Sequence, residues 1–158
     1  MIIKSPSPDV DIPNITVTDY VLREAARLKD KPAIIDGPSG RTLTFGELAG
    51  AIKATAAGLG ARGFNKGDVF AIYSPNVPEY AVVFNAVASV GGINTTINPL
   101  YTADELTKQL NDCSARFIVT VPPFLDKALE AAAQSQVEEV FVFGEAEGAT
   151  PFASLVRP

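Results

Sequence analysis

From residue 67 onward, short apolar runs alternate with stretches whose apolar residues recur at helical spacing. Residues 69–73 are apolar throughout, which is typical of a strand covered on both faces. The expected elements are a strand over 69–73, a helix over 78–90, a strand over 93–97, a helix over 102–112, a strand over 116–120, a helix over 122–135 and a strand over 138–143. This alternation predicts a parallel sheet with right-handed crossovers. We therefore expect an α/β fold built on a mostly parallel, doubly wound sheet of repeated βα units.

The first 66 residues predict a different arrangement. The expected elements are an extended, proline-rich arm over 1–16, a helix capped by Thr18 or Asp19 and running to about Lys29, a strand over 32–36, a turn over 37–40 and a strand over 41–44. Turn residues between two apolar runs favour a small hairpin. A longer helix follows, with Leu48, Ile52 and Leu59 at helical spacing. We expect an N-terminal helix and hairpin to precede the sheet.

Several of these helices carry start signals. Thr44 and Thr102 each precede a glutamate by three positions, which is the spacing of a capping box. Asn76 is a candidate cap for the helix expected from residue 78. The acidic pairs 104–105 and 138–139 are explained more simply as helix-start and strand-edge charges than as acid–base pairs.

Gly58, Gly60 and Gly63 match the G-x-G-x-x-G spacing of dinucleotide-binding loops. That function needs a strand before the glycines and a helix after them, so that pyrophosphate meets a helix N-terminus. Here the expected helix comes first and the strand second, and the negative end of a helix dipole disfavours phosphate. We interpret these glycines as a helix stop. The phosphate-loop spacing G-x-x-x-x-G-K-[ST] does not occur in the sequence.

Composition excludes several classes of function. The net charge of −5 and the lack of a basic run argue against a nucleic-acid partner. The chain has no histidine and one cysteine, which excludes a Ser-His-Asp triad and the usual zinc sites within it. Cys113 cannot form an intramolecular disulfide, and we interpret it as a small buried hydrophobic residue. With 47% hydrophobic residues over 158 positions, the chain is long enough to bury a sizeable core.

Nothing in the sequence predicts a transmembrane segment. The N-terminus lacks the apolar core and cleavage site of a signal peptide. The longest apolar stretch, 80–93, is interrupted by polar residues and glycines and is shorter than the ~20 residues that span a bilayer. We expect a cytoplasmic protein, with peripheral membrane contact left open.

Six segments in order resemble one enzyme family. They are residues 43–48, 67–72, 75–80, 88–92, 98–106 and 109–115. The fifth, Asn-Pro-Leu-Tyr-Thr-Ala-Asp-Glu-Leu, resembles the Asn-Pro-x-Tyr-Thr-x-x-Glu-Leu signature of adenylate-forming acyl-CoA ligases, in particular the 4-coumarate-CoA and fatty-acid-CoA ligases. The ordered set extends over about residues 16–143. The chain is thus similar to the N-terminal part of such a ligase.

The resemblance implies a two-step reaction. A carboxylate attacks the α-phosphate of ATP to give an acyl-adenylate and pyrophosphate, and the thiol of CoA then displaces AMP to give an acyl thioester. ATP, CoA and Mg²⁺ are therefore implied for the full-length parent, together with a small carboxylic acid substrate. The family's catalytic motifs have no match in this chain, so no catalytic residue is assigned. We expect the 158 residues alone to be inactive and to bind none of these ligands tightly.

The resemblance also implies a candidate cofactor contact. In related synthetases the segment matching Asn98, Leu100 and Tyr101 lies near the path of CoA, and a positive residue further along the chain, matched here by Lys127, helps to bind phosphate. The alternative is a structural one, in which a proline turn packs Tyr101 and Lys127 is a solvated surface residue.

The predicted organisation is an incomplete AMP-binding domain over 1–158. It divides into an N-terminal portion (1–66), a βαβαβαβ subdomain (67–143) and a loop-like tail (144–158) that ends in the start of a helix. The expected partner is the remainder of the parent chain. A rival interpretation is a free-standing α/β module that binds a ligand or partner without catalysis. A fragment predicts a large exposed apolar surface, which can drive dimerisation.

Overall fold

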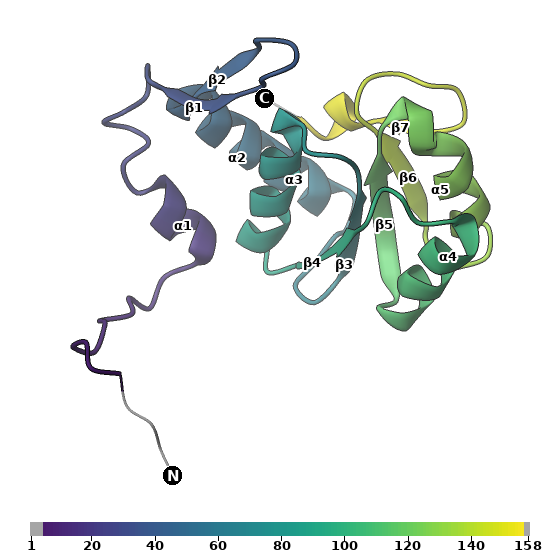
Figure 1. The fold of residues 1–158 in the computed structure, drawn as a ribbon, viewed down its shortest axis with the longest axis horizontal. Helices are drawn as coiled ribbons and strands as arrows, with labels where there is room; N and C mark the ends of the chain where they lie inside the picture. Colours follow the sequence, from purple (N-terminus) through teal and green to yellow (C-terminus); the bar gives the residue numbers. More distant parts are fainter. Residues whose placement is uncertain (1–4, 157–158) are drawn as a thin grey trace.

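The computed structural model describes residues 5–156 and contains one five-stranded sheet (Figure 1). The strands are β3 (Val69–Tyr73), β4 (Ile93–Ile97), β5 (Ala115–Thr120), β6 (Glu139–Val142) and β7 (Thr150–Pro151). Their order across the sheet is β4-β3-β5-β6-β7, and every neighbouring pair is parallel. The predicted parallel α/β fold is confirmed.

Helices cover both faces of this sheet, as the doubly wound prediction requires. The helices are α2 (Phe45–Ala61), α3 (Pro78–Ser89), α4 (Ala103–Asp112) and α5 (Leu125–Ala132). Phe70 and Ile72 belong to one core with residues of α2 and α3. Ala71 and Tyr73 belong to a second core with residues of α4 and α5. Because β3 contributes to both cores, all five of its residues are buried, which explains its unbroken apolar sequence.

The N-terminal helix differs from its prediction. It is α1 (Val17–Leu22), and Thr16 is its N-cap, since the Thr16 hydroxyl oxygen accepts a hydrogen bond from the Asp19 backbone N–H at 3.0 Å. Thr18 cannot cap, because its buried hydroxyl donates to the Asn85 carbonyl oxygen of α3 at 3.0 Å. The chain leaves helical geometry after Leu22 and continues as turns.

The predicted hairpin is confirmed, as β1 (Pro32–Ile35) pairs antiparallel with β2 (Thr42–Thr44). Both capping boxes also form, with Thr44 and Thr102 as the caps of α2 and α4. The cap assigned to Asn76 is wrong. Val77 occupies the N-cap of α3 and makes no side-chain cap bond, because its side chain has no hydrogen-bond acceptor. Pro78 stands at the first helical position, where its missing N–H leaves one fewer donor to satisfy.

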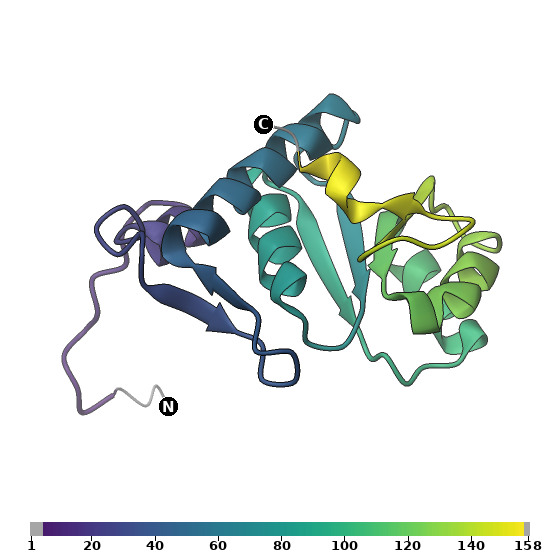
Figure 2. The same cartoon turned by 90° about the horizontal axis from the view of Figure 1, so that it is seen from above.

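The region after β5 is less regular than predicted. A short 3₁₀ turn, η1 (Pro122–Phe124), precedes α5, which ends at Ala132. The tail is not loop-like throughout, since β7 extends the sheet beside β6 and is followed by the 3₁₀ turn η2 (Phe152–Leu155). Figure 2 shows η2, in yellow, lying beside α2. Phe152 and Leu155 are buried in the core that α2 shares, so apolar burial holds the tail in place.

The glycine motif occupies the C-terminal end of α2, as interpreted from the sequence. The helix ends at Ala61, and Gly63 has a φ of +73°, a conformation that glycine adopts without strain. Strand β3 follows rather than precedes it. The divisions expected at residues 66/67 and 143/144 stay predictions.

Two surface properties bear on partners. Within residues 5–156, none of the helices has the combination of length and apolarity that a bilayer crossing requires. Large apolar side chains are exposed along the arm and α1, at Val10, Ile12, Ile15, Val17, Tyr20 and Val21. Residues 1–4 of the expected arm and residues 157–158 of the expected tail lie outside the described residues. Dimerisation and a cytoplasmic location stay predictions.

Candidate functional site

The carboxyl ends of the strands define the place where this fold can hold a ligand. In the order β4-β3-β5, the chain moves outward from β3 to β4 and then crosses back to β5 on the other side. Such a reversal opens a crevice at the carboxyl edge of a parallel sheet. The segments that leave this edge begin at Ser74, Asn98 and Val121. Asn98, Leu100 and Tyr101, which follow β4, therefore lie at this edge.

Residues 98–101 form a tight turn stabilised by the side chain and the backbone of Asn98. The Tyr101 N–H donates to the Asn98 carbonyl oxygen at 3.0 Å, and the Leu100 N–H donates to Asn98 Oδ1 at 3.0 Å. Leu100, in the middle of this turn, is 82% exposed. The turn leads directly into the Thr102 cap of α4. Local polar bonds thus present an apolar side chain to solvent at the sheet edge.

The carbonyl oxygen of Tyr101 is a point of convergence for three segments. The hydroxyl of Tyr73, at the end of β3, donates to it at 3.1 Å, and Lys127 Nζ of α5 approaches it at 3.4 Å. The Tyr73 ring is buried and lies 5.6 Å from the ring of Phe124. Burial raises the pKa of the Tyr73 hydroxyl, which therefore remains a protonated donor at neutral pH. This arrangement fixes the turn against both β3 and α5.

The structure brings some predicted residues together and leaves others apart. Lys127 and Tyr101 are 26 positions apart in sequence and within hydrogen-bond distance in space. Among the described residues, no hydrogen bond links Lys127 to Asn98 or to Leu100. Lys127 is exposed, so its ammonium is accessible to solvent as well as to the Tyr101 carbonyl. Contact of these four residues with CoA stays a prediction.

A polar groove of about 340 Å³ begins at Tyr101 and continues along α4. Its other lining residues are Glu105, Lys108, Gln109 and Asp112. The Thr102 backbone N–H, which bonds to Glu105, lowers the pKa of that carboxyl group. Gln109 Nε2 donates to Thr95 Oγ1 at 2.9 Å and so ties α4 to the edge strand β4. The groove holds two carboxylates and one lysine, which is a poor environment for a polyanion.

Sequence reasoning missed Tyr73, Phe124 and Thr120 at this edge. The Thr120 hydroxyl is fully buried at the carboxyl end of β5 and has no hydrogen-bond partner among the described residues. A polar residue that ends an apolar strand was the available signal for both Tyr73 and Thr120. Cys113 is half-buried at the C-cap of α4, rather than fully buried as expected, because the helix ends there. Across residues 5–156, no three His, Cys, Asp or Glu side chains cluster as metal ligands do.

A model of the family described as "AMP-binding enzyme" matches residues 21–153, most of the chain. The chain therefore belongs to this family. The particular relatives are CoA ligases, which confirms the resemblance carried by the six segments.

Two curated plant relatives illustrate the match. The chain is 35% identical over 157 residues to 4-coumarate–CoA ligase 3 of Oryza sativa subsp. japonica, covering 99% of this chain and 28% of that protein. It is 39% identical over 131 residues to 4-coumarate–CoA ligase 4 of Arabidopsis thaliana, covering 80% of this chain and 23% of the relative. The chain thus spans about a quarter of the length of these curated relatives.

Solved structures agree with the fold. A long-chain-fatty-acid-CoA ligase from Archaeoglobus fulgidus superposes with a TM-score of 0.85 at 26% identity, covering 97% of this chain and 32% of that one. An anthranilate CoA ligase in complex with anthranoyl-AMP superposes with a TM-score of 0.83 at 22% identity, covering 91% of this chain and 27% of that one. Most of this fold therefore recurs within these longer CoA ligases.

Proposed function

We propose that the chain is the N-terminal part of a carboxylate–CoA ligase. The parent activates an aromatic or fatty acid with ATP, forming an acyl-adenylate and releasing pyrophosphate. The CoA sulfur then forms a bond to the acyl carbon, the bond from that carbon to the AMP oxygen breaks, and AMP leaves. The observation that carries this proposal is the family match over residues 21–153, to which the relatives add their ligase descriptions.

In this proposal, the contribution of the chain to chemistry is positional. The turn over residues 98–101 borders the path of CoA, where Leu100 offers an apolar contact and Lys127 a positive charge. The support is geometric, because Tyr73 and Lys127 both converge on the Tyr101 carbonyl at the carboxyl edge of the sheet. An exposed ammonium at that edge favours a phosphate-bearing ligand through Coulomb attraction.

Within the described residues, the chain does not fit ATP or Mg²⁺ on its own. Its G-x-G-x-x-G glycines lie at the C-terminal end of α2. The negative end of the helix dipole there disfavours the binding of phosphate. Residues 5–156 also hold no cluster of three candidate metal ligands. We therefore assign neither the adenylation step nor a metal contact to residues of this chain, and propose that the remainder of the parent supplies both.

Thioester formation from ATP, CoA and a panel of aromatic and fatty acids tests the proposal. We expect no product from residues 1–158 alone and a product with at least one acid from a longer protein that contains them. Turnover by residues 1–158 would contradict the assignment of chemistry to the rest of the parent. Failure of the longer protein with every acid, despite binding of a ligand by the short chain, would instead support a non-catalytic α/β module.

A further inference from the structure

Tyr73 ends the central strand β3, and its side chain is fully buried. It lies with Ala71 in the core that β3 shares with α4 and α5, since alternate residues of a strand face the same side. A buried tyrosine normally finds a partner for its hydroxyl. Here that partner is the Tyr101 carbonyl oxygen, 3.1 Å away. This hydrogen bond therefore joins the central strand to the exposed turn at the sheet edge.

The ring of Tyr73 contacts the segment that carries Lys127. Its centroid lies 5.6 Å from that of Phe124 in η1, directly before α5. Leu125 and Ala128 of α5 are buried in the same core as Tyr73. The start of α5 is thus held against β3 by apolar contacts, while Lys127 is exposed on the same helix.

One carbonyl oxygen links the turn to α5. Lys127 Nζ lies 3.4 Å from the Tyr101 carbonyl oxygen, which also accepts the Tyr73 hydroxyl bond. An exposed lysine has many accessible rotamers, so a bond to a carbonyl orients it only where that carbonyl is itself fixed. Asn98 stabilises the turn internally, and Tyr73 attaches it to the sheet. The buried hydroxyl therefore supplies the fixed point that the lysine lacks.

We propose that Tyr73 is a positioning residue for the CoA contact: its hydroxyl holds the turn over residues 98–101 and its ring holds the start of α5, so that Leu100 and Lys127 face one ligand. This inference rests on the proposed function, since the ligand is the CoA of the thioester-forming step. Tyr73 acts only through these two segments, because its own side chain is fully buried. It has no part in the adenylation step.

The two half-reactions of a longer, active parent protein separate positioning from a general loss of stability. Tyr73→Phe keeps the ring and removes only the hydroxyl. We expect kcat/KM for CoA to fall about three- to tenfold, the factor that one hydrogen bond contributes. ATP–pyrophosphate exchange, which needs no CoA, should keep its wild-type rate. Equal losses in both assays would overturn the proposal, because a destabilised protein loses both.

Tyr80→Phe is the matched control for loss of a phenolic hydroxyl. Tyr80 belongs to α3 and packs against the core on the opposite face of the sheet. The variant should leave both half-reactions unchanged. A fall in kcat/KM for CoA equal to that of Tyr73→Phe would show that the effect does not depend on the Tyr101 carbonyl and would overturn the proposal.

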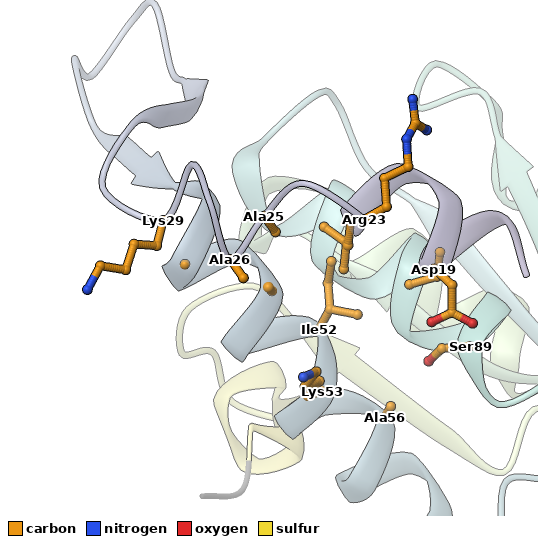
Figure 3. A pocket seen from close by; sticks show the side chains of 13 residues that line it. Asp19, Arg23, Ala25, Ala26, Lys29, Ile52, Lys53, Ala56 and Ser89 are labelled. Atoms are coloured by element: carbon orange, nitrogen blue, oxygen red, sulfur yellow. The ribbon is translucent and has the colours of Figure 1, made fainter.

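A second substitution tests whether Tyr73 and Lys127 act through one carbonyl. Residues that share a partner have non-additive effects. Tyr73→Phe should therefore reduce kcat/KM for CoA less in a Lys127→Gln background than in the wild type. Lys53→Gln is the control background, because Lys53 lines a groove of about 640 Å³ between α1 and α2, on the other face of the sheet (Figure 3). There the full effect should persist, and an equal effect in all three backgrounds would overturn the shared role.

Amide hydrogen exchange of the 158-residue chain gives a readout that needs no activity. Tyr73→Phe should speed exchange of the Leu100 and Tyr101 amides about three- to tenfold, since the turn loses its bond to the sheet. Exchange at Ile118, in β5, should stay unchanged and shows that the variant is folded. Unchanged exchange at the turn would overturn the proposal.

The outcomes distinguish this inference from the proposed function. If Lys127→Gln lowers kcat/KM for CoA and Tyr73→Phe does not, the positioning role is wrong and the proposed function stands. If the longer protein forms no thioester with any acid, the proposed function fails and the positioning role fails with it.

Discussion

Gly58 of α2 lies directly against the backbone of Leu155 in η2. A Cβ atom placed on Gly58 would overlap the Leu155 carbonyl oxygen. Arg62, one turn further along the helix, donates to Ser154 at 2.9 Å and forms an ion pair with Glu139 of β6. The end of α2 therefore holds the tail against the sheet by close backbone approach and by a charged side chain.

Gly58→Ala should destabilise the protein because the obstructing atoms belong to backbone, which cannot rotate away. We expect the free energy of unfolding to fall by about 1–3 kcal/mol, the usual cost of overpacking. Gly50→Ala is the matched control in the same helix, since a Cβ there meets nothing within 4 Å. That control should be stabilising by about 0.5–1 kcal/mol. Urea unfolding of both variants checks the prediction, and equal effects would contradict it.

Asp68 should make stability depend on pH on the acidic side. The Asn65 backbone N–H, and then Arg116 at 2.8 Å, lower the pKa of the Asp68 carboxyl group. Because folding lowers the pKa of this carboxyl group, the ionised group stabilises the protein at pH values above its ordinary pKa. This stabilisation is lost as the pH of the solution falls through the lowered pKa. Asp68→Asn should therefore cost about 1 kcal/mol at pH 7 and progressively less below about pH 4.

Urea midpoints of the wild type and Asp68→Asn between pH 7 and pH 2.5 measure this difference. The gap should be constant from pH 7 to pH 5 and close as the solution becomes more acidic. A gap that widens at low pH would show that the side chain acts through packing rather than through its charge.

Lys127→Gln tests the proposed CoA contact in a longer, active protein. Removing the positive charge while keeping a polar side chain should raise KM for CoA about three- to tenfold with kcat unchanged, as expected when uniform binding is lost. Lys66→Gln is the matched control, because Lys66 is a lysine in the turn that precedes β3. An unchanged KM for CoA, or the same change in the control, would favour the structural interpretation of Lys127.

The exposed arm predicts self-association of the 158-residue chain. Val10 and Ile12 are 82% and 85% exposed, and exposed apolar surface favours association. We expect a dimer in sedimentation experiments and a shift to monomer for Ile12→Ser combined with Ile15→Ser. Ile35→Ser, on the hairpin, is the control. A monomer at every wild-type concentration would contradict the prediction.

The sequence predicted elements well where one local signal decided them. Two threonine–glutamate pairs predicted the starts of α2 and α4, and the apolar run at β3 predicted a strand buried on both faces. The predictions failed where a contact between residues far apart in the sequence determined the local structure. Thr18 is not a cap because its hydroxyl donates to the Asn85 backbone carbonyl oxygen. The residues after 144 are packed because Leu155 is buried in a core with residues of α2. No local pattern contains those partners.

The candidate site divides in the same way. Asn98 and Pro99 predicted the turn, because an Asn-Pro pair after a strand forms one locally. Tyr73 and Lys127 converge on the Tyr101 carbonyl oxygen only because the fold places β3, α4 and α5 next to one another. Sequence periodicity gives the direction of a side chain relative to its own helix or strand. The arrangement of the helices and strands relative to one another depends on the whole sheet.

The close contact between α2 and η2 also has a consequence during synthesis. Arg62 and Ser154 are 92 positions apart, so α2 leaves the ribosome long before its partner exists. At the usual ~5–20 residues per second, the wait lasts roughly 5 to 20 s. During that time the face of α2 around Gly58 has no covering segment. The nascent chain is therefore open to chaperones or to premature association at a surface that the finished protein conceals.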